Sequence, residues 1–454
     1  MQKHSLFLVL GLALGIGNSL DAGAQQARTL SLKEAVSLSI SNNKSLKQSQ
    51  YALEGAKAGL QEAKERRLPD VKVSGSYMRL NTPSLSGNLL QMMAGGSGGQ
   101  GSEAGSIKVN QVAFGMANAS LPLFSGNRIN NGIKAATYLE KAAAYDVDHQ
   151  ADLVIDNTIE AYYNLYKAQA YLKLVEENNR TALNRVKDFA NLEKNGVIPR
   201  NDLLNVQLQQ KNMELAILDA ENNVKIANYN FDLMLGLDEN TILAVEGLNG
   251  DQHQQLAPIE EYVTNALSDR SDVKALDSRL NATQVNTKIT KGAYLPSVAL
   301  TGGYVAADVH NMLTVTNAMN VGVGLSYNIA DLYKTGAKVK QARAQEAEMQ
   351  MVKSNLLDGV KIEIHKAYQD FRESSQKVNV LKTAVELAEE NYKIVKNKYD
   401  NSLATATELL DADANKLQAA VNYEFSMIDN LIAYNKLLRA SGQITSVYAP
   451  SSSN

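Results

Sequence analysis

The feature that most constrains this chain is an internal tandem repeat. At an offset of 227 positions, identical residues recur in one register over about 40 residues, as expected of duplicated structural units. The matched pairs are Glu34 with Glu261, Val36 with Val263, Lys47 with Lys274, Lys64 with Lys291, and Leu68-Pro69 with Leu295-Pro296. Both halves therefore carry the same local signals and are expected to form the same elements in the same order.

Two stretches further along also match each other. NGVIPRNDLLNVQ (195–207) corresponds to NSLATATELLDAD (401–413) at an offset of 206, which aligns Gly196 with Ser402. The offset falls because the first half has about 21 extra residues, which we place in a flexible Gly/Ser-rich loop at 81–106. Each stretch interrupts a helical pattern, so each is expected to be a tight turn between two long helices.

The flanking segments have the spacing of coiled-coil helices. Apolar residues recur at alternating steps of three and four, as in Val378, Leu381, Val385, Ala388, Tyr392, Val395 and Tyr399. None of the seven prolines interrupts these segments. A helix over 128–194 would be on the order of 100 Å long, at roughly 1.5 Å per residue, which is far more than a globular core needs.

Other segments alternate with period two, which predicts strands. The clearest is VGVGLSYNI (321–329), where apolar residues alternate with small or polar ones. The domain order expected from these patterns is a signal segment (1–24), a first repeat (25–235), an equatorial segment with the start of the second repeat (236–270), the second repeat (271–441) and a C-terminal tail (442–454). The first repeat is expected to contain a single helix before its strands, strands at about 70–80 and 106–122 and long helices at about 128–194 and 201–235. The second is likewise expected to contain a single helix before its strands, strands at about 297–309 and 320–330 and long helices at about 336–400 and 405–441.

Composition and the N-terminal residues indicate an exported protein. The chain has 454 residues, no cysteine and a net charge of −3, so it has no basic excess that would suggest nucleic acid and it cannot form disulfides. Lys3, the apolar run 5–17 and the small residues 22–24 have the layout of a secretory signal peptide. Since no cysteine follows, N-terminal lipid attachment is not expected. Without a later apolar run of about 18 residues, the alternatives are a soluble exported protein or a membrane β-barrel.

Four strands with one apolar face are suited to lipid on one side and water on the other. A bilayer admits a sheet only when its edges are closed, and closed membrane barrels have at least about eight strands. The chain would therefore have to pool its strands with further copies, and the pattern alone leaves two, three or more copies open. The long helices would then form a ring below the barrel and continue its pore.

Several motifs, in order and duplicated, resemble the TolC family of outer-membrane efflux proteins. They are LSLKEAVSLSISNN (30–43), LPDVKVSGSY (68–77), LPLFSGNR (121–128), NGVIPRNDLLNVQ (195–207) and ELLDADANKLQAA (408–420). The resemblance spans nearly the whole mature chain. It implies an α/β membrane protein, in which three chains with four strands each build a twelve-stranded outer-membrane β-barrel that a coiled-coil helical tunnel continues into the periplasm.

The resemblance also implies a function and partners. The homotrimer would be the passive exit duct of a tripartite pump in a Gram-negative outer membrane, and it would export small molecules such as drugs or toxic compounds. Its partners would be a periplasmic adaptor protein, an inner-membrane transporter and outer-membrane lipid. Ducts for type I protein secretion or for metal-ion export remain alternatives, because a duct need not select its cargo.

Particular residues of the two turns match functional positions of the family. Glu408 and Asp411 match acids that ring the periplasmic gate, while Asp202 and Tyr399 match a polar latch between the two hairpins. The family's latch is reinforced by an arginine, and this chain has Ala404 there. The turn residues expected to contact the adaptor are Gly196, Val197, Ser402 and Leu403.

The residues also allow simpler interpretations. Thr405 with Glu408 has the T-x-x-E spacing of a helix capping box, so Glu408 could serve only its own helix. Asp413 is expected to be a solvated or intersubunit charge. Apart from the duct, a coiled-coil periplasmic adaptor is a weaker hypothesis, since adaptors typically have one hairpin per chain.

An enzyme is not expected. The G-x-S-x-G and G-x-G-x-x-G matches at 95–101 overlap in the low-complexity loop without the strand and helix that such motifs require. The five histidines are scattered and form no H-E-x-x-H motif, so no metal site and no cofactor are expected.

Overall fold

The computed structural model describes residues 28–81, 109–246, 256–310 and 313–448. The expected signal segment, nearly all of the Gly/Ser-rich loop and the end of the tail therefore lie outside the described residues. The chain divides into two compact units. One comprises the described parts of Met1–Leu38 and Ala161–Asp251, and the other those of Ser39–Glu160 and Gln252–Asn454.

The first unit combines a helical hairpin with a small parallel sheet. The hairpin consists of α4 (Arg128–Lys194), which enters this unit at Ala161, and α5 (Arg200–Leu235). Strands β1 (Arg28–Leu30) and β4 (Leu243–Val245) pair in parallel, a feature that the sequence patterns do not predict. The Tyr162 hydroxyl donates to the carbonyl oxygen of Leu30 at 3.2 Å, and its ring meets Phe231 edge to face. These contacts fix the small sheet on the base of the hairpin.

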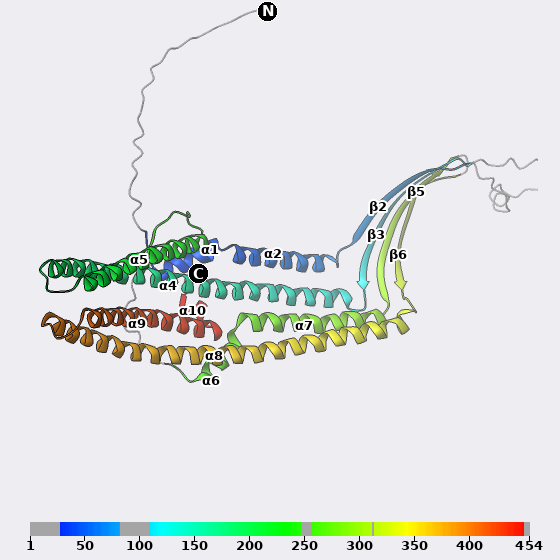
Figure 1. The fold of residues 1–454 in the computed structure, drawn as a ribbon. Coiled ribbons are helices and arrows are strands. Elements are labelled where there is room, and N and C mark those ends of the chain that lie inside the picture. The colour runs from blue at the N-terminus through cyan, green and yellow to red at the C-terminus, as the bar shows by residue number, and fades with distance from the viewer. Residues whose placement is uncertain (1–27, 82–108, 247–255, 311–312, 449–454) are drawn as a thin grey trace, which may run out of the picture. The chain divides into compact units, whose positions relative to one another are not determined.

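The second unit contains a four-stranded antiparallel sheet (Figure 1). Its spatial order is β2 (Asp70–Arg79), β3 (Gln111–Phe124), β5 (Ser297–Val309) and β6 (Leu313–Ser326). Three bounds differ from the expected ones by four residues or more: β3 begins at Gln111 and not at 106, and β6 runs from Leu313 to Ser326 and not from 320 to 330. The early part of β6 alternates over LTVT (313–316) but loses the period at Asn317, where the backbone is left-handed (φ 60°) and the register against β5 shifts.

The strand register sorts the side chains of the sheet onto two faces, since directly opposed residues lie on one face. One face has the row Val73, Ala117, Tyr304 and Met319, and the other has the row Lys72, Asn118, Gly303 and Asn320. Valines of the first face are largely exposed within one chain, with Val73 at 81% and Val321 at 83%. The sheet therefore has an apolar face that a single chain leaves uncovered and an opposite face that is mostly polar over these rows.

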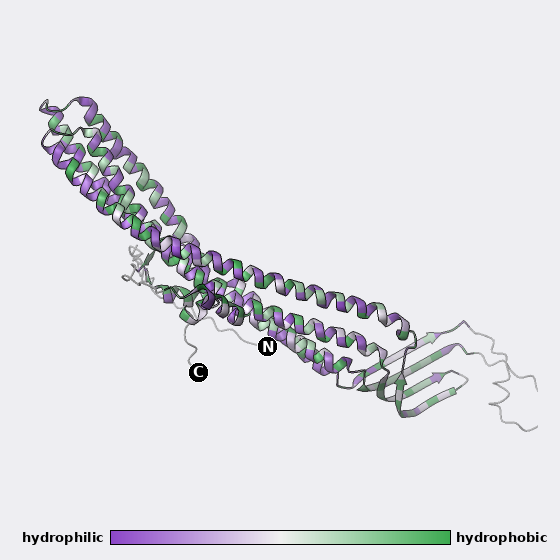
Figure 2. Cartoon of the chain, turned by 90° about the horizontal axis from the view of Figure 1, so that it is seen from below, coloured by the Kyte–Doolittle hydropathy of each residue, from purple (hydrophilic) through white to green (hydrophobic). Residues whose placement is uncertain are grey.

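The second unit also contains a helical hairpin and shorter helices. Its helices are α2 (Lys44–Glu65), α6 (Ile259–Asp269), α7 (Ser271–Lys291), α8 (Asp331–Asp400), α9 (Ala406–Ala440) and α10 (Ile444–Tyr448), with a 3-10 turn η1 (Gly292–Tyr294) after α7. Helix α1 (Leu32–Asn42) enters it at Ser39. A core of Val360, Ile364, Phe371 and Leu437, with Val273 of α7, joins α8 to its neighbours. Figure 2 shows the mixture of hydrophobic and hydrophilic residues along these helices that the heptad spacing predicts.

One helix start and two helix breaks differ from the expectations from sequence. Helix α8 begins at Asp331 and not at 336, because Asn328 forms a turn in which its side-chain oxygen accepts from the Ala330 amide at 3.1 Å. The equatorial segment 236–270 contains β4 and α6, and the tail contains α10. The single helix expected before each strand pair is broken in two, at Asn43 in the first repeat and at Arg270 in the second. Within the described parts, no helix is long and apolar enough to cross a membrane.

Candidate functional site

The first matched turn joins α4 to α5 as a Schellman motif. Gly196 has a left-handed backbone (φ 68°), and the amide of Val197 donates to the carbonyl oxygen of Leu192 at 2.9 Å. Glycine tolerates this conformation because it has no Cβ. Helix α5 then begins after Pro199, which provides no side-chain cap. The Val197 side chain is 65% exposed at the tip of the hairpin.

The second matched turn repeats this backbone with other residues. Ser402 takes the left-handed position (φ 62°), and the amide of Leu403 donates to the carbonyl oxygen of Lys398 at 2.7 Å. Leu403 is 76% exposed, in the position that Val197 has in the first turn. The alignment of Gly196 with Ser402 in the sequence thus corresponds to one backbone motif made twice. A serine in this conformation is under local strain that a glycine avoids.

The second turn is closed by a complete capping box. The Thr405 hydroxyl accepts from the Glu408 amide at 3.2 Å, while a carboxylate oxygen of Glu408 accepts from the Thr405 amide at 2.7 Å. These hydrogen bonds lower the pKa of Glu408 and keep it charged. Glu408 therefore has a local role on its own helix, one turn before the exposed Asp411. Asp413, expected to be solvated or at an interface between subunits, is instead buried within the chain.

The two residues expected to form the latch belong to different units. Asp202 lies in the first turn of α5 and accepts a hydrogen bond from the side chain of Asn201 at 3.0 Å. Tyr399 lies half-buried on the last turn of α8, close in sequence to Ala404. Each residue is thus at the end of a hairpin, as the matched turns predict.

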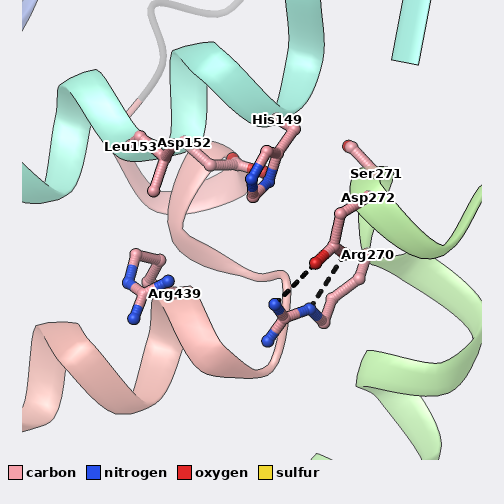
Figure 3. Close-up of a pocket in the computed structure, with 7 residues that line it drawn as sticks. All are labelled: His149, Asp152, Leu153, Arg270, Ser271, Asp272 and Arg439. Atoms are coloured by element: carbon pink, nitrogen blue, oxygen red, sulfur yellow. Dashed lines mark hydrogen bonds and ion pairs between the residues drawn. The ribbon is translucent and has the colours of Figure 1, made fainter. Parts of the chain in front are cut away.

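An ion network in the second unit, centred on Arg270, is absent from the sequence-based expectations. Arg270 lies at the break between α6 and α7 and is 7% exposed. Its guanidinium donates to both carboxylate oxygens of Asp272 at 3.0 and 2.8 Å (Figure 3). It also donates to Glu363 of α8 at 2.6 Å and to the carbonyl oxygen of Ala440 at the end of α9 at 2.9 Å. One buried cation thereby joins three helices.

The network extends from Glu363 toward α4. Arg439 donates to Glu363 at 2.6 Å, and its Nε lies 2.9 Å from a carboxylate oxygen of Asp156. Lys436 pairs with Glu160 one turn further along α4, at 3.3 Å. Asp152 is bound by the Thr445 hydroxyl of α10. Acids one turn apart on α4 would repel each other in an isolated helix. In the folded chain, basic side chains of α9 and a hydroxyl of α10 bind these acids.

Burial and pairing act in opposite directions on these carboxyl groups. Burial raises the pKa of Asp156 and outweighs the effect of Arg439, and it likewise raises the pKa of Asp152. Burial would also raise the pKa of Asp272 and Glu363, but Arg270, together with Arg439 at Glu363, outweighs it and lowers both pKa values. Asp272 and Glu363, beside Arg270, are therefore firmly ionised. Burial disfavours the charged forms of Asp152 and Asp156 on α4.

The sequence contains little that could reveal this network. Arg270 and Glu363 are 93 positions apart and Arg270 and Ala440 are 170 apart, so no local pattern connects them. The one available signal is the mismatch at the aligned position, where the first repeat has Asn43. Among the described residues, no group of three or more His, Cys, Asp or Glu side chains is arranged to hold a metal ion.

Comparison with known proteins identifies the family. The family model described as "Outer membrane efflux protein" matches residues 35–237 and 262–443, which include both turns and all four strands of the large sheet. The chain belongs to this family of outer membrane efflux proteins, and its class is therefore that of outer-membrane transport channels. A family of channels also agrees with the lack of enzyme motifs in the sequence.

Relatives and solved structures are similar over most of the chain. "Outer membrane efflux protein BepC" of Brucella suis biovar 1 is 21% identical over 325 residues, which cover 71% of this chain and 70% of the relative. "Cation efflux system protein CusC" of Escherichia coli O157:H7 is 23% identical over 295 residues, which cover 63% of this chain but only 58% of the relative. The structure of the CmeC outer membrane channel of Campylobacter jejuni is similar with a TM-score of 0.77 at 19% identity, over 97% of this chain and 94% of that one. The fold is thus that of outer-membrane efflux channels.

Proposed function

We propose that three copies of this chain form one duct, with a twelve-stranded barrel in the outer membrane and a helical tunnel in the periplasm. The observation that carries this proposal is the two-faced sheet. Its apolar face, which includes Val73 and Val321, is exposed in the single chain, and its outer strands β2 and β6 each have one edge without a partner strand among the described residues. The apolar face is suited to contact lipid, but open strand edges cannot remain unpaired in a membrane, so further copies have to close the sheet.

The polar face of the sheet would line the pore. Gly303 lies between Asn118 and Asn320, and a Cβ on Gly303 would lie 2.5 Å from the side-chain oxygen of Asn320. A larger residue at Gly303 would displace the two amides, so Asn118 and Asn320 pack closely over the glycine on this polar face. Below the barrel, hairpins α4–α5 and α8–α9 would form the tunnel wall, and the two Schellman turns would be its periplasmic end.

The test of this proposal is made on the purified full-length protein. We expect it to be extracted from the outer membrane only with detergent, to run as a heat-sensitive trimer and to form channels in planar bilayers. Chemical crosslinking should give a largest product of three chains. A soluble monomer in the periplasmic fraction would contradict the proposal and favour the adaptor hypothesis.

Glu408 and Asp411 are proposed to narrow the periplasmic end of the duct. They lie three residues apart on one helix, so three copies would bring six carboxylates around the lumen and favour cations. Replacing both with alanine should raise single-channel conductance and weaken cation selectivity. The matched control is Glu386→Ala with Glu389→Ala, exposed acids of α8 with the same spacing. Unchanged conductance and selectivity in the first variant would remove both residues from the gate.

The remaining residues of the turns are proposed to hold and dock the tip. Asp202 and Tyr399 would form the latch, without the arginine that Ala404 replaces, and Asp202→Ala should raise the fraction of open channels.

The periplasmic adaptor of an inner-membrane transporter would contact the turn residues Gly196, Val197, Ser402 and Leu403. Since the chain has no cysteine, single cysteines at Val197 and Leu403 can be crosslinked selectively in cells. Failure of both positions to capture an adaptor would contradict this assignment.

The proposed cargo is small molecules such as drugs or toxic compounds. The name of the relative CusC refers to cation efflux, so metal-ion export is the second candidate, and type I protein secretion is a third. Deletion of the gene followed by growth in graded drugs and metal salts separates the first two. Sensitivity to metal salts alone would favour cation export.

A further inference from the structure

Four chain segments join helices to strands at the same end of the large sheet. They are 62–69 between α2 and β2, 125–134 between β3 and α4, 288–296 between α7 and β5, and 327–338 between β6 and α8. We call these four segments the collar. They all belong to the second unit, so their mutual arrangement is described within one compact body.

Close contacts hold the collar together. A Cβ on Gly126 would lie 2.3 Å from the carbonyl oxygen of Gly292, and a Cβ on Gly292 would lie 2.5 Å from that of Gly126, so two backbones meet where only glycine fits. The Arg67 guanidinium donates to the Asn130 side chain at 2.8 Å and fastens the end of α2 to α4. The backbone of Gly336 in α8 lies beside the Tyr294 hydroxyl. The side chains of all four segments are thereby brought to one level below the sheet.

The collar is strongly basic, although the whole chain has a net charge of −3. Its nine basic residues are Lys64, Arg66, Arg67, Arg128, Lys134, Lys288, Lys291, Lys334 and Lys338, and its three acidic residues are Glu62, Glu65 and Asp331, which gives a net charge of +6. All nine basic side chains are exposed. In the described residues none of the six lysines has a carboxylate partner, and Arg66 alone forms an ion pair, with Glu62. The positive charge is therefore available to a partner.

Exposed apolar and aromatic side chains accompany this charge. Ile329 is 70% exposed and Tyr333 74% exposed, and Leu123, Phe124 and Tyr327 are also exposed around the base of the sheet. Tyrosines are enriched where proteins cross the membrane–water interface, and lysine and arginine extend their charges from there into the headgroup region. The collar combines both features directly beside the apolar face of the sheet.

We propose that the collar binds the anionic phospholipid headgroups of the leaflet that meets the helix end of the barrel. This inference rests on the proposed membrane insertion of the sheet and adds a lipid class to it. The partner is identified by charge complementarity, because phosphate-bearing anionic lipids attract clustered Lys and Arg near a membrane surface. The position of the collar supports the same partner. The collar adjoins the helix end of the lipid-facing sheet, at the level where lipid headgroups would lie.

The experiment compares lipids on the purified full-length protein in a neutral detergent. Dioleoylphosphatidylglycerol and dioleoylphosphatidylcholine are titrated separately, and bound lipids are counted by native mass spectrometry while the melting temperature of the oligomer is followed. We expect the anionic lipid to bind more tightly and to raise the melting temperature, with both effects reduced in high salt. Replacing Lys288, Lys291, Lys334 and Lys338 with glutamine should weaken apparent affinity for phosphatidylglycerol by about tenfold or more.

The matched control removes four lysines from elsewhere on the same unit. Lys361, Lys382, Lys393 and Lys396 are exposed residues of α8 away from the collar, and their replacement with glutamine should leave lipid binding unchanged. Equal binding of the two lipids, or equal loss in the two variants, would overturn the proposal. So would an equal stabilisation by inorganic phosphate at the same concentration, since that indicates a soluble-anion site. A protein that conducts in bilayers but ignores lipid charge would refute this inference alone and leave the proposed duct intact.

Discussion

Asn43 and Arg270 occupy the same position in the two repeats and stabilise the same helix break in different ways. Asn43 is a local cap, whose side-chain oxygen accepts from the Leu46 amide at 3.0 Å. Arg270 makes no such cap and instead reaches Asp272, Glu363 and the end of α9. The helix after Asn43 is exposed along most of its length, whereas α7 buries a continuous side. At aligned positions, the first helix thus has a self-sufficient start, whereas the second begins at a residue that joins helices distant in sequence.

In a second aligned pair, the polar residue lies in the first repeat and an apolar residue takes its place in the second. Asp232 near the end of α5 is aligned with Leu438 of α9, and both are buried. Leu438 fits an apolar site, while Asp232 receives a hydrogen bond from Asn228 at 2.7 Å on one carboxylate oxygen only. Burial, with a contribution from Asp238, raises the pKa of Asp232 to about 6. Here the first repeat has a buried polar side chain with a partner in its own helix, and the second has an apolar one.

The largest effect is expected from Arg270→Ala. Asp272 and Glu363 would lose a buried cation, and breaking a buried ion pair costs about 3–5 kcal/mol. Hydrogen exchange of α7 and α8 should report this loss of stability. The control is Arg279→Ala, which removes a half-exposed pair with Asp146 and should cost at most about 1 kcal/mol. Equal effects of the two substitutions would mean that Arg270 is not a junction.

Asp232→Asn should stabilise the first unit at neutral pH. Because the pKa of Asp232 is raised in the folded chain, its protonated form is favoured there, and stability is lost as pH rises from about 4 through about 6. A shift of roughly two units corresponds to about 2–3 kcal/mol at pH 7. The gain, measured by hydrogen exchange of α5 and β4, should vanish below about pH 4. Asp219→Asn, at an exposed site of the same helix, should show neither the gain nor its pH dependence.

Asn43→Ala tests whether the Asn43 cap stabilises only its own helix. Loss of the cap should destabilise α2 by about 1 kcal/mol, and the effect should stay within that helix. Exchange rates of the first amides of α2 should rise while those of α7 stay constant. Replacing Asn43 with aspartate should restore the cap, since a carboxylate accepts the same hydrogen bond.

The smallest effects are expected at the two turns. Ser402→Gly should stabilise the second hairpin by about 0.5–1 kcal/mol, because glycine adopts the left-handed position without strain, and Gly196→Ser should destabilise the first by a similar amount. Unfolding of the two variants, followed by exchange at the hairpin ends, should therefore shift in opposite directions. A shift of the same sign in both would show that the turns are not equivalent.

Much of the architecture could be predicted from the sequence, because its signals are local and repeated. Heptad spacing without proline indicated the long helices α4 and α8, and the aligned turns indicated their ends. Strand β6 was placed too far along the chain because the irregularity at Asn317 interrupts the alternation inside the strand. For the site, the capping box of Glu408 follows from the spacing of Thr405 and Glu408 alone. The contacts of Arg270 could not be predicted, since each depends on how helices distant in sequence pack.

The length of α8 has a mechanical consequence. From Glu363, which Arg270 holds, to the turn at Leu403 the helix extends about 55 Å, at 1.5 Å per residue. If the hairpin tilts as a stiff lever about that junction, a rotation of about 5° displaces its end by about 5 Å, nearly the rise of one helical turn. Side-chain rearrangements of a few tenths of an ångström at the junction of Arg270 and Glu363 would thus produce larger displacements at the tip of the hairpin. The size of the opening at the end of the hairpin would then depend on how firmly the ion pairs of Arg270 hold α8 at its base.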